Sequence, residues 1–195
     1  ILTETTVDRN TTGEFVASIF ESLGTAAYVT GDRTSTITVT SSHSGNIASG
    51  TLANWVNGDT TTQNSTHSWY WDANGTTAGR WIQFDFGSAK IITENRYYTS
   101  SHNSNGFWKW QGSNDASSWT DIGATWEKTN GGSAGTGTET ITTMSGNTTA
   151  YRYYRMLGVS GTTANPWERE IEFKYAAVAG VTGKETRLHG WAVNY

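Results

Sequence analysis

The sequence predicts an all-β protein built as an antiparallel β-sandwich, and three observations lead to that fold class. The chain of 195 residues contains 22 glycines, one proline, 10 tryptophans and 9 tyrosines, together with many threonines. Threonine and aromatic residues favour strands, and glycine favours the turns between them. Short segments alternate with a period of two and are separated by Gly, Asn and Ser clusters, without the spacing of βαβ units.

Charge and hydropathy narrow the possible partners. The net charge is −4, and the Lys and Arg residues are scattered along the chain. A nucleic-acid partner would need a basic face, so we expect none. No apolar run approaches the roughly 20 residues that span a membrane, and no basic patch points to anionic lipid. The chain has no cysteine, so disulfides do not stabilise it.

The clearest strand is "RWIQFDFG", which places Ile82, Phe84 and Phe86 on one face and polar residues on the other. "STITVT" and "YRYYRMLGV" repeat this period. In "REIEFKY", Ile171 and Phe173 share one side and glutamates share the other. We therefore expect these segments to form half-buried strands of the sandwich.

The two ends of the chain differ from the middle. In "TTGEFVASIFESLG", Thr11 and Glu14 resemble a capping box, and apolar residues at helical spacing predict a short helix over 12–23. A strand is the alternative, because "VASIFESL" also fits a period of two. Near the C-terminus, "LHGWAVNY" places Trp191, Val193 and Tyr195 on one face of a predicted strand.

Three tryptophans stand close together in "GFWKWQGSNDASSW". Trp108 and Trp110 lie two apart, so a strand points both to one face, with polar residues on the other. Trp119 follows the turn "GSNDASS" and is expected to fold back onto the same core. We interpret all three as scaffold, since a buried tryptophan contributes on the order of 200 Å² to a core. The alternative is a platform for sugars.

These motifs together resemble the discoidin family, also called the coagulation factor 5/8 type C domain, which includes the family 32 carbohydrate-binding modules. The matching segments, in order, are "GRWIQFDFGSAKIIT", "WKWQGSNDASSWTDI", "YRYYRMLGVSG" and "REIEF". One departure is Ala116, where the turn usually has glycine. The resemblance implies a jelly roll of about eight strands over residues 35–175, with ligand loops at one end. It leaves an N-terminal extension, 1–34, and a C-terminal extension, 176–195, which we expect to contain a strand.

The resemblance also implies a structural calcium ion. "NWVNGDTTT" is similar to a family loop that wraps the metal with help from the closing strand. The ligands carried over are Val56 through its carbonyl, Asn57, Asp59, Thr62 and Glu170. Asn57 replaces the usual aspartate, which removes one negative charge and should weaken binding. The alternative is a plain Asn-Gly turn between strands.

We expect no enzyme. The sequence has no cysteine, no G-x-S-x-G and no H-E-x-x-H motif, and its four histidines are dispersed. Glu168, Glu170 and Glu172 could mimic a glycosidase pair, but such pairs face each other across a cleft rather than along one strand. We interpret them as one metal ligand plus solvated surface.

The resemblance implies a sugar site in three loops, "NSTHSWYW", "SSHNSNG" and "TTANPWE". Trp69 and Trp167 are aromatic residues in these loops that could stack on a pyranose ring. Amide and imidazole groups there could bond to sugar hydroxyls, namely those of His67, His102, Asn103, Asn105 and Asn165. His102 departs from the arginine of many sugar-binding relatives. The alternative is that these are ordinary polar loops.

The predicted function is therefore a non-catalytic, lectin-like module that binds extracellular or cell-surface polysaccharide in adhesion or host attachment. The alternative is a structural or adhesive protein of a virion, such as a tail fibre or spike, or of another surface assembly. That alternative draws on the Thr- and Gly-rich composition and on the terminal segments, whose apolar faces also predict a homo-oligomer or larger assembly. Either function places the chain outside the cell, on a cell surface or on a virion.

Overall fold

The computed structural model describes residues 5–9, 15–19, 25–42, 47–61, 69–71, 75–99, 105–129, 137–162, 167–176 and 186–188. The chain forms two compact units. One comprises Ala27–Ala176, and the other joins Ile1–Ala26 with Ala177–Tyr195. None of the described helical turns is long and apolar enough to cross a membrane.

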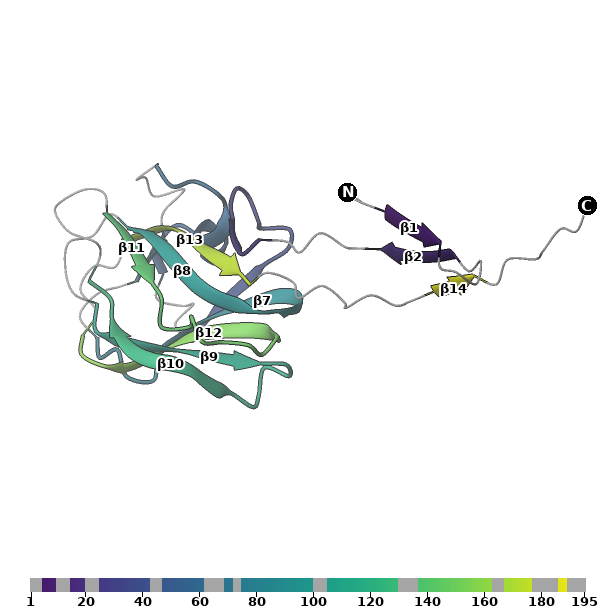
Figure 1. Cartoon of the computed structure of the whole chain (residues 1–195). Coiled ribbons are helices and arrows are strands. Elements are labelled where there is room, and N and C mark those ends of the chain that lie inside the picture. The colour runs from purple at the N-terminus through teal and green to yellow at the C-terminus, as the bar shows by residue number, and fades with distance from the viewer. Residues whose placement is uncertain are drawn as a thin grey trace, which may run out of the picture. The chain divides into compact units, whose positions relative to one another are not determined.

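The larger unit is a β-sandwich of two antiparallel sheets, as predicted. The first sheet has the strand order β10-β9-β12-β7-β4; its strands are β4 (Thr38–Ser41), β7 (Trp81–Lys90), β9 (Phe107–Ser113), β10 (Thr120–Glu127) and β12 (Tyr151–Ser160). The second has the order β11-β8-β13-β6-β5, and β3 also pairs with β13; its strands are β3 (Ala27–Val29), β5 (Ile47–Ser49), β6 (Trp69–Trp71), β8 (Ile92–Thr99), β11 (Gly137–Ile141) and β13 (Trp167–Tyr175). Figure 1 shows β8, β11 and β13 in one layer and β9, β10 and β12 in the other.

Aromatic residues from both sheets fill the space between them. Ile82, Phe84 and Phe86 are buried while their neighbours on β7 are partly exposed, which confirms the predicted alternation. The rings of Phe84 and Phe173 lie 5.0 Å apart, edge to face, and link β7 to β13 across the core. Trp110 packs on Phe173 from β9 at 5.8 Å. Edge-to-face contacts of this kind stabilise a core beyond the area they bury.

The boundary of the sandwich lies further upstream than predicted. Its compact unit begins at Ala27 rather than at residue 35, because β3 pairs with the end of β13 and Arg33 is buried within the unit. The short 3-10 helix η2 (Leu52–Val56) follows β5 and buries Trp55 and Val56 in the core.

The smaller unit is a three-stranded antiparallel sheet of β1 (Thr5–Arg9), β2 (Phe15–Ile19) and β14 (Thr186–Leu188), in the order β1-β2-β14. The helix predicted over 12–23 is therefore wrong where the structure describes this segment. The period-two interpretation holds instead, because β2 pairs with β1 and with a distant strand that local spacing does not reveal. Trp191, Val193 and Tyr195 lie outside the described residues.

Candidate functional site

Three segments meet at one end of the sandwich, where the predicted sugar loops join the strands. Thr76 forms a bridge with Thr162, and the Thr77 amide donates to the Gly161 carbonyl at 2.9 Å. Gly106 has a φ of +76°, and a Cβ atom there would lie 2.3 Å from Thr77 Oγ1. Glycine is required at this position by both its backbone and its neighbours. Gly106, before β9, and Gly161, after β12, therefore both pack closely against Thr77 at this end of the sandwich, which we call the loop end.

Lys128 is the residue that connects the loop end to β13. The Asn105 amide donates to the Lys128 carbonyl at 2.9 Å, and the Lys128 amide donates to the Gly106 carbonyl at 3.0 Å. The Lys128 ammonium lies 2.6 Å from a carboxylate oxygen of Glu168, and both side chains are almost fully buried. Lys128 therefore joins Asn105 and Gly106, which precede β9, to the start of β13.

Trp69 and Trp167 begin strands rather than standing in loops. Trp69 is the first residue of β6 and Trp167 the first of β13. The two strands pair, with Trp167 opposite Tyr70 and Glu168 opposite Trp69. The structure thus brings together the backbones of the two tryptophan positions that the sequence predicted for the sugar site.

The remaining predicted sugar contacts divide into two groups. His67, His102, Asn103 and Asn165 lie outside the described residues. Asn105 is fully buried, and its carbonyl accepts a hydrogen bond of 2.7 Å from the Trp108 indole. Its backbone groups bond to Lys128 and to the Trp108 indole, and its role as a sugar contact stays a prediction.

The cluster of three tryptophans also divides. Trp108 and Trp110 are fully buried, which confirms them as scaffold. Trp119 is only partly buried, and the Arg155 guanidinium lies 4.0 Å from the centre of its ring. Arg155 belongs to the polar face of β12, so Trp119 packs on the outside of the sheet rather than on the core. The turn before it, held by hydrogen bonds to Asp115, does not return the chain inward.

The predicted calcium loop lies against the segment that follows β3. The Val56 carbonyl accepts a hydrogen bond of 2.8 Å from the Arg33 amide. Asn57 Oδ1 accepts one of 2.9 Å from the Asp59 amide, and one oxygen of Glu170 accepts one of 2.8 Å from the Gly58 amide. These contacts close the loop onto β13.

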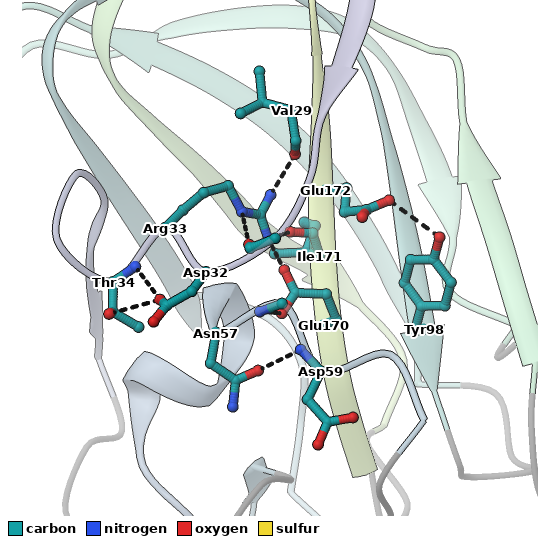
Figure 2. Close-up of polar contacts among 12 residues, drawn as sticks. Val29, Asp32, Arg33, Thr34, Asn57, Asp59, Tyr98, Glu170, Ile171 and Glu172 are labelled. Atoms are coloured by element: carbon teal, nitrogen blue, oxygen red, sulfur yellow. Dashed lines mark hydrogen bonds and ion pairs between the residues drawn. The ribbon is translucent and has the colours of Figure 1, made fainter.

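Arg33 completes this cluster, as Figure 2 shows. Its guanidinium forms an ion pair with Glu170, and the two side chains are 4% and 0% exposed. The same guanidinium donates to the backbone carbonyls of Val29, Gly31 and Ile171 at 2.9, 3.1 and 2.9 Å. Burial lowers the pKa of Arg33, and nearby acidic groups, with Glu172 first, oppose that shift. A guanidinium stays protonated in proteins, so Arg33 brings a fixed positive charge to this position.

Comparison with known proteins places this architecture in a family. The model of the F5/8 type C domain matches residues 36–173. The chain belongs to the F5/8 type C domain family. No curated protein matches the chain.

Solved F5/8-like domains share the fold at low sequence identity. The C-terminal domain of a chitobiase from Bacteroides fragilis is 15% identical, with 78% of this chain and 99% of that chain covered and a TM-score of 0.54. The CpGH89CBM32-5 module of Clostridium perfringens, solved with GalNAc-β-1,3-galactose, is 14% identical over 75% and 99% of the two chains, with a TM-score of 0.53. The family 32 module of C. perfringens NanJ, solved with galactose, is 14% identical over 74% and 98%, with a TM-score of 0.51.

The calcium ligands that the F5/8 type C resemblance implies do not fit a metal ion in this arrangement. The Val56 carbonyl, the Asn57 amide oxygen and one Glu170 oxygen accept hydrogen bonds from backbone amides, and the Glu170 carboxylate is ion-paired with Arg33. Thr62 lies outside the described residues. Among the residues that the structure describes, no group of three or more His, Cys, Asp or Glu side chains could hold a metal.

The three glutamates of β13 are not solvated surface in this F5/8 type C domain. Each is buried and paired with a cation: Glu168 with Lys128, Glu170 with Arg33, and Glu172 with Arg96. They do not share one face either, because the pairing with β8 shifts between Glu168 and Glu170. Sequence reasoning missed Arg33 and Lys128. The sequence did carry one signal for them. A strand that has two large core residues also carries three glutamates, and any of these that is buried requires a cation nearby.

Proposed function

We propose that this F5/8 type C domain is a non-catalytic carbohydrate-binding module whose site lies at the loop end of the sandwich. The observation that carries the proposal is the pairing of β6 with β13, which sets Trp167 opposite Tyr70 and Glu168 opposite Trp69. Glu168, which follows Trp167, is ion-paired with Lys128, and the Lys128 backbone bonds to Asn105 and Gly106. Tryptophan offers a flat apolar surface, and a tryptophan on a paired strand costs little entropy when it binds a ligand.

Galactose-type sugars are the first ligands to test. Two of the solved relatives with this fold were determined with galactose or GalNAc-β-1,3-galactose. The uncharged donors and acceptors predicted in the loops, His67, His102, Asn103 and Asn165, suit hydroxyl groups. We therefore propose neutral pyranosides, presented on extracellular or cell-surface glycans, as the ligand class.

The ion pairs of β13 support a binding role over a hydrolytic one. A glycosidase needs two carboxyl groups on either side of the scissile bond. Glu168, Glu170 and Glu172 are each held by a cation within the protein, so these three carboxylates are committed to the fold. Incubation with galactosides should release no new reducing ends.

The structural alternative receives less support. Its argument from a helical apolar face over 15–23 loses its basis, because the structure has a strand at Phe15–Ile19. An assembly of several chains remains a prediction, to be tested by light scattering of the full chain beside a 27–176 truncation, which keeps the whole larger unit. If both proteins are monomeric at tens of micromolar, the prediction is contradicted.

The test of the proposed site is Trp167→Ala, measured by isothermal titration with galactose and GalNAc-β-1,3-galactose and by a glycan array. Loss of a stacking tryptophan is expected to weaken binding by about 1–3 kcal/mol, which corresponds to roughly 5- to 150-fold. His102→Ala is expected to weaken it less.

Two tryptophans serve as controls for this experiment. Trp119→Ala removes a ring of the same size from the outer face of the sheet, next to Arg155, and should leave glycan affinity unchanged. Trp110→Ala should lower stability by about 3–5 kcal/mol, because it truncates a fully buried ring. A Trp167→Ala variant that melts lower but binds normally would show that Trp167 is scaffold.

A further inference from the structure

Arg33 contacts two of the groups for which the family resemblance predicts a calcium ion. Its backbone amide bonds to the Val56 carbonyl, and its guanidinium pairs with Glu170. Val56 and Glu170 are both predicted calcium ligands. We propose that the Arg33 guanidinium is the cation that holds the calcium-like loop on β13, and that this domain folds and keeps that loop in place without calcium.

The guanidinium is fixed by more than its ion pair. Its three nitrogens donate to the carbonyls of Val29, Gly31 and Ile171, in addition to Glu170. The carbonyls come from β3, from the turn after it and from β13. A planar fork of donors suits this set, because one rigid group satisfies acceptors in several directions. If Arg33 withdrew to admit a metal ion, it would leave three carbonyls without these partners.

The loop itself has few oxygens left for a metal. Calcium takes six to eight oxygen ligands. One oxygen of Glu170 is ion-paired with Arg33 and the other accepts a hydrogen bond from the Gly58 amide. The Asn57 amide oxygen accepts a hydrogen bond from the Asp59 amide within the loop. A calcium ion would have to replace these donors rather than fill vacant positions.

Electrostatics acts in the same direction. The Arg33 side chain is 4% exposed and is ion-paired with Glu170, which is itself fully buried. A divalent cation at Glu170 would therefore meet repulsion from a buried guanidinium.

Backbone packing closes the loop from the side of Arg33. Gly58 has a φ of +81°, and a Cβ atom there would lie 2.5 Å from the Gly31 carbonyl carbon and 2.6 Å from the Asp32 amide nitrogen. Figure 2 shows the segment with Asp32 and Arg33 beside the loop with Asn57 and Asp59. The segment that carries the guanidinium thus covers the loop.

The first test uses the full wild-type chain with calcium as the probe. Its melting temperature is measured in EDTA and in calcium chloride at about 1 mM, which is the largest dissociation constant typical of extracellular calcium modules. Magnesium chloride at the same concentration is the ionic control. The expected result is the same melting temperature in all three solutions and no calcium-binding heat by titration. A rise of several degrees in calcium alone would overturn the proposal.

The second test asks whether the two charges depend on each other. Arg33→Met, Glu170→Gln and the double variant form a cycle, with Arg152→Met as the control for a partly exposed arginine, itself paired with Asp85. Each single variant should melt well below the control, and the double variant should melt above Arg33→Met, because the carboxylate then no longer needs a cation. Strictly additive losses would contradict the proposal. If Arg33→Met does not fold, Glu170→Gln and the calcium titration of the wild type still decide.

Discussion

Strand β13 carries two buried ion pairs, Lys128–Glu168 and Arg33–Glu170, and they hold their charges differently. The Lys128 ammonium has Glu168 at 2.6 Å and the Tyr97 ring centre at 5.0 Å. Arg33 distributes its charge over one carboxylate and three carbonyls. An ammonium is a compact charge and a guanidinium a planar fork, so Arg33 can bind three backbone carbonyls together with its carboxylate.

An irregularity in the sheet separates these two pairs. Glu168 lies opposite Thr99 and Glu170 opposite Tyr98, although one residue stands between the glutamates. Adjacent residues of a strand point to opposite faces, so the extra residue turns Glu168 and Glu170 to different sides of the sheet. A bulge of this kind redirects side chains without breaking the strand. It allows one strand to serve the loop end and the calcium-like loop at once.

Removal of the lysine is expected to have the largest effect on this comparison. Lys128→Met leaves Glu168 buried without its cation, which should lower the free energy of unfolding by about 3–5 kcal/mol. Urea denaturation measures the loss. Lys109→Met is the matched control, because Lys109 pairs with the half-exposed Asp121 and should cost about 0–1 kcal/mol. Equal losses in both variants would show that burial does not set the strength of the pair.

A smaller loss of stability is expected when the Arg33 guanidinium is replaced by an ammonium. Arg33→Lys keeps the positive charge near Glu170 but cannot reach the carbonyls of Val29, Gly31 and Ile171 together. We expect a loss of about 1–3 kcal/mol, the cost of leaving buried acceptors unsatisfied, as measured by the same denaturation. A lysine variant as stable as the wild type would mean that charge alone holds the loop and that the carbonyls contribute nothing.

The smallest effect concerns pH. Burial raises the pKa of Glu168 above its ordinary value of 4.5, while Lys128 lowers it and Glu139 raises it further. The folded chain then keeps this proton to a higher pH than the unfolded chain does. The stability from this carboxyl is therefore full below pH 4.5 and is lost as the pH rises through the raised pKa.

The variant Glu168→Gln tests that sign, with unfolding measured from neutral pH down to about 4.5. Wild type should gain stability over Glu168→Gln as the pH falls. The carboxyls of Asp85 and Asp121, whose pKa values are lowered by hydrogen bonds first of all, act in the opposite direction in both proteins and cancel in the difference. A difference between the two proteins that does not change with pH would show that Glu168 titrates as it does in the unfolded chain.

Local patterns predicted those parts of the molecule that depend on a residue's immediate neighbours. The alternation on β7 and the spacing of Trp108 and Trp110 identified buried positions that the structure confirms. Alternation gave no guide to Trp119, which follows a turn, because it does not say how a turn redirects the chain. Helical spacing failed for β2, where the period-two alternative holds because this strand pairs with β1 and with the distant β14.

The ion pairs could not be predicted from alternation, because each joins distant segments. Glu170 has the pattern of a solvent-facing residue, yet β3, the calcium-like loop and Arg33 cover it. A period of two assigns a side chain to a face but does not say what lies over that face. The proposed sugar site shares this dependence, because the register of β6 and β13 sets Trp167 opposite Tyr70 and Trp69 opposite Glu168.

The position of Arg33 also has a practical consequence for excising or transplanting the domain. The family match begins at residue 36, whereas β3 and Arg33 precede it and belong to the same compact unit, which begins at Ala27. A fragment cut at the family border would carry Glu170 without its counter-charge and β13 without a neighbouring strand. A recombinant module or chimeric fusion should therefore start at or before Ala27.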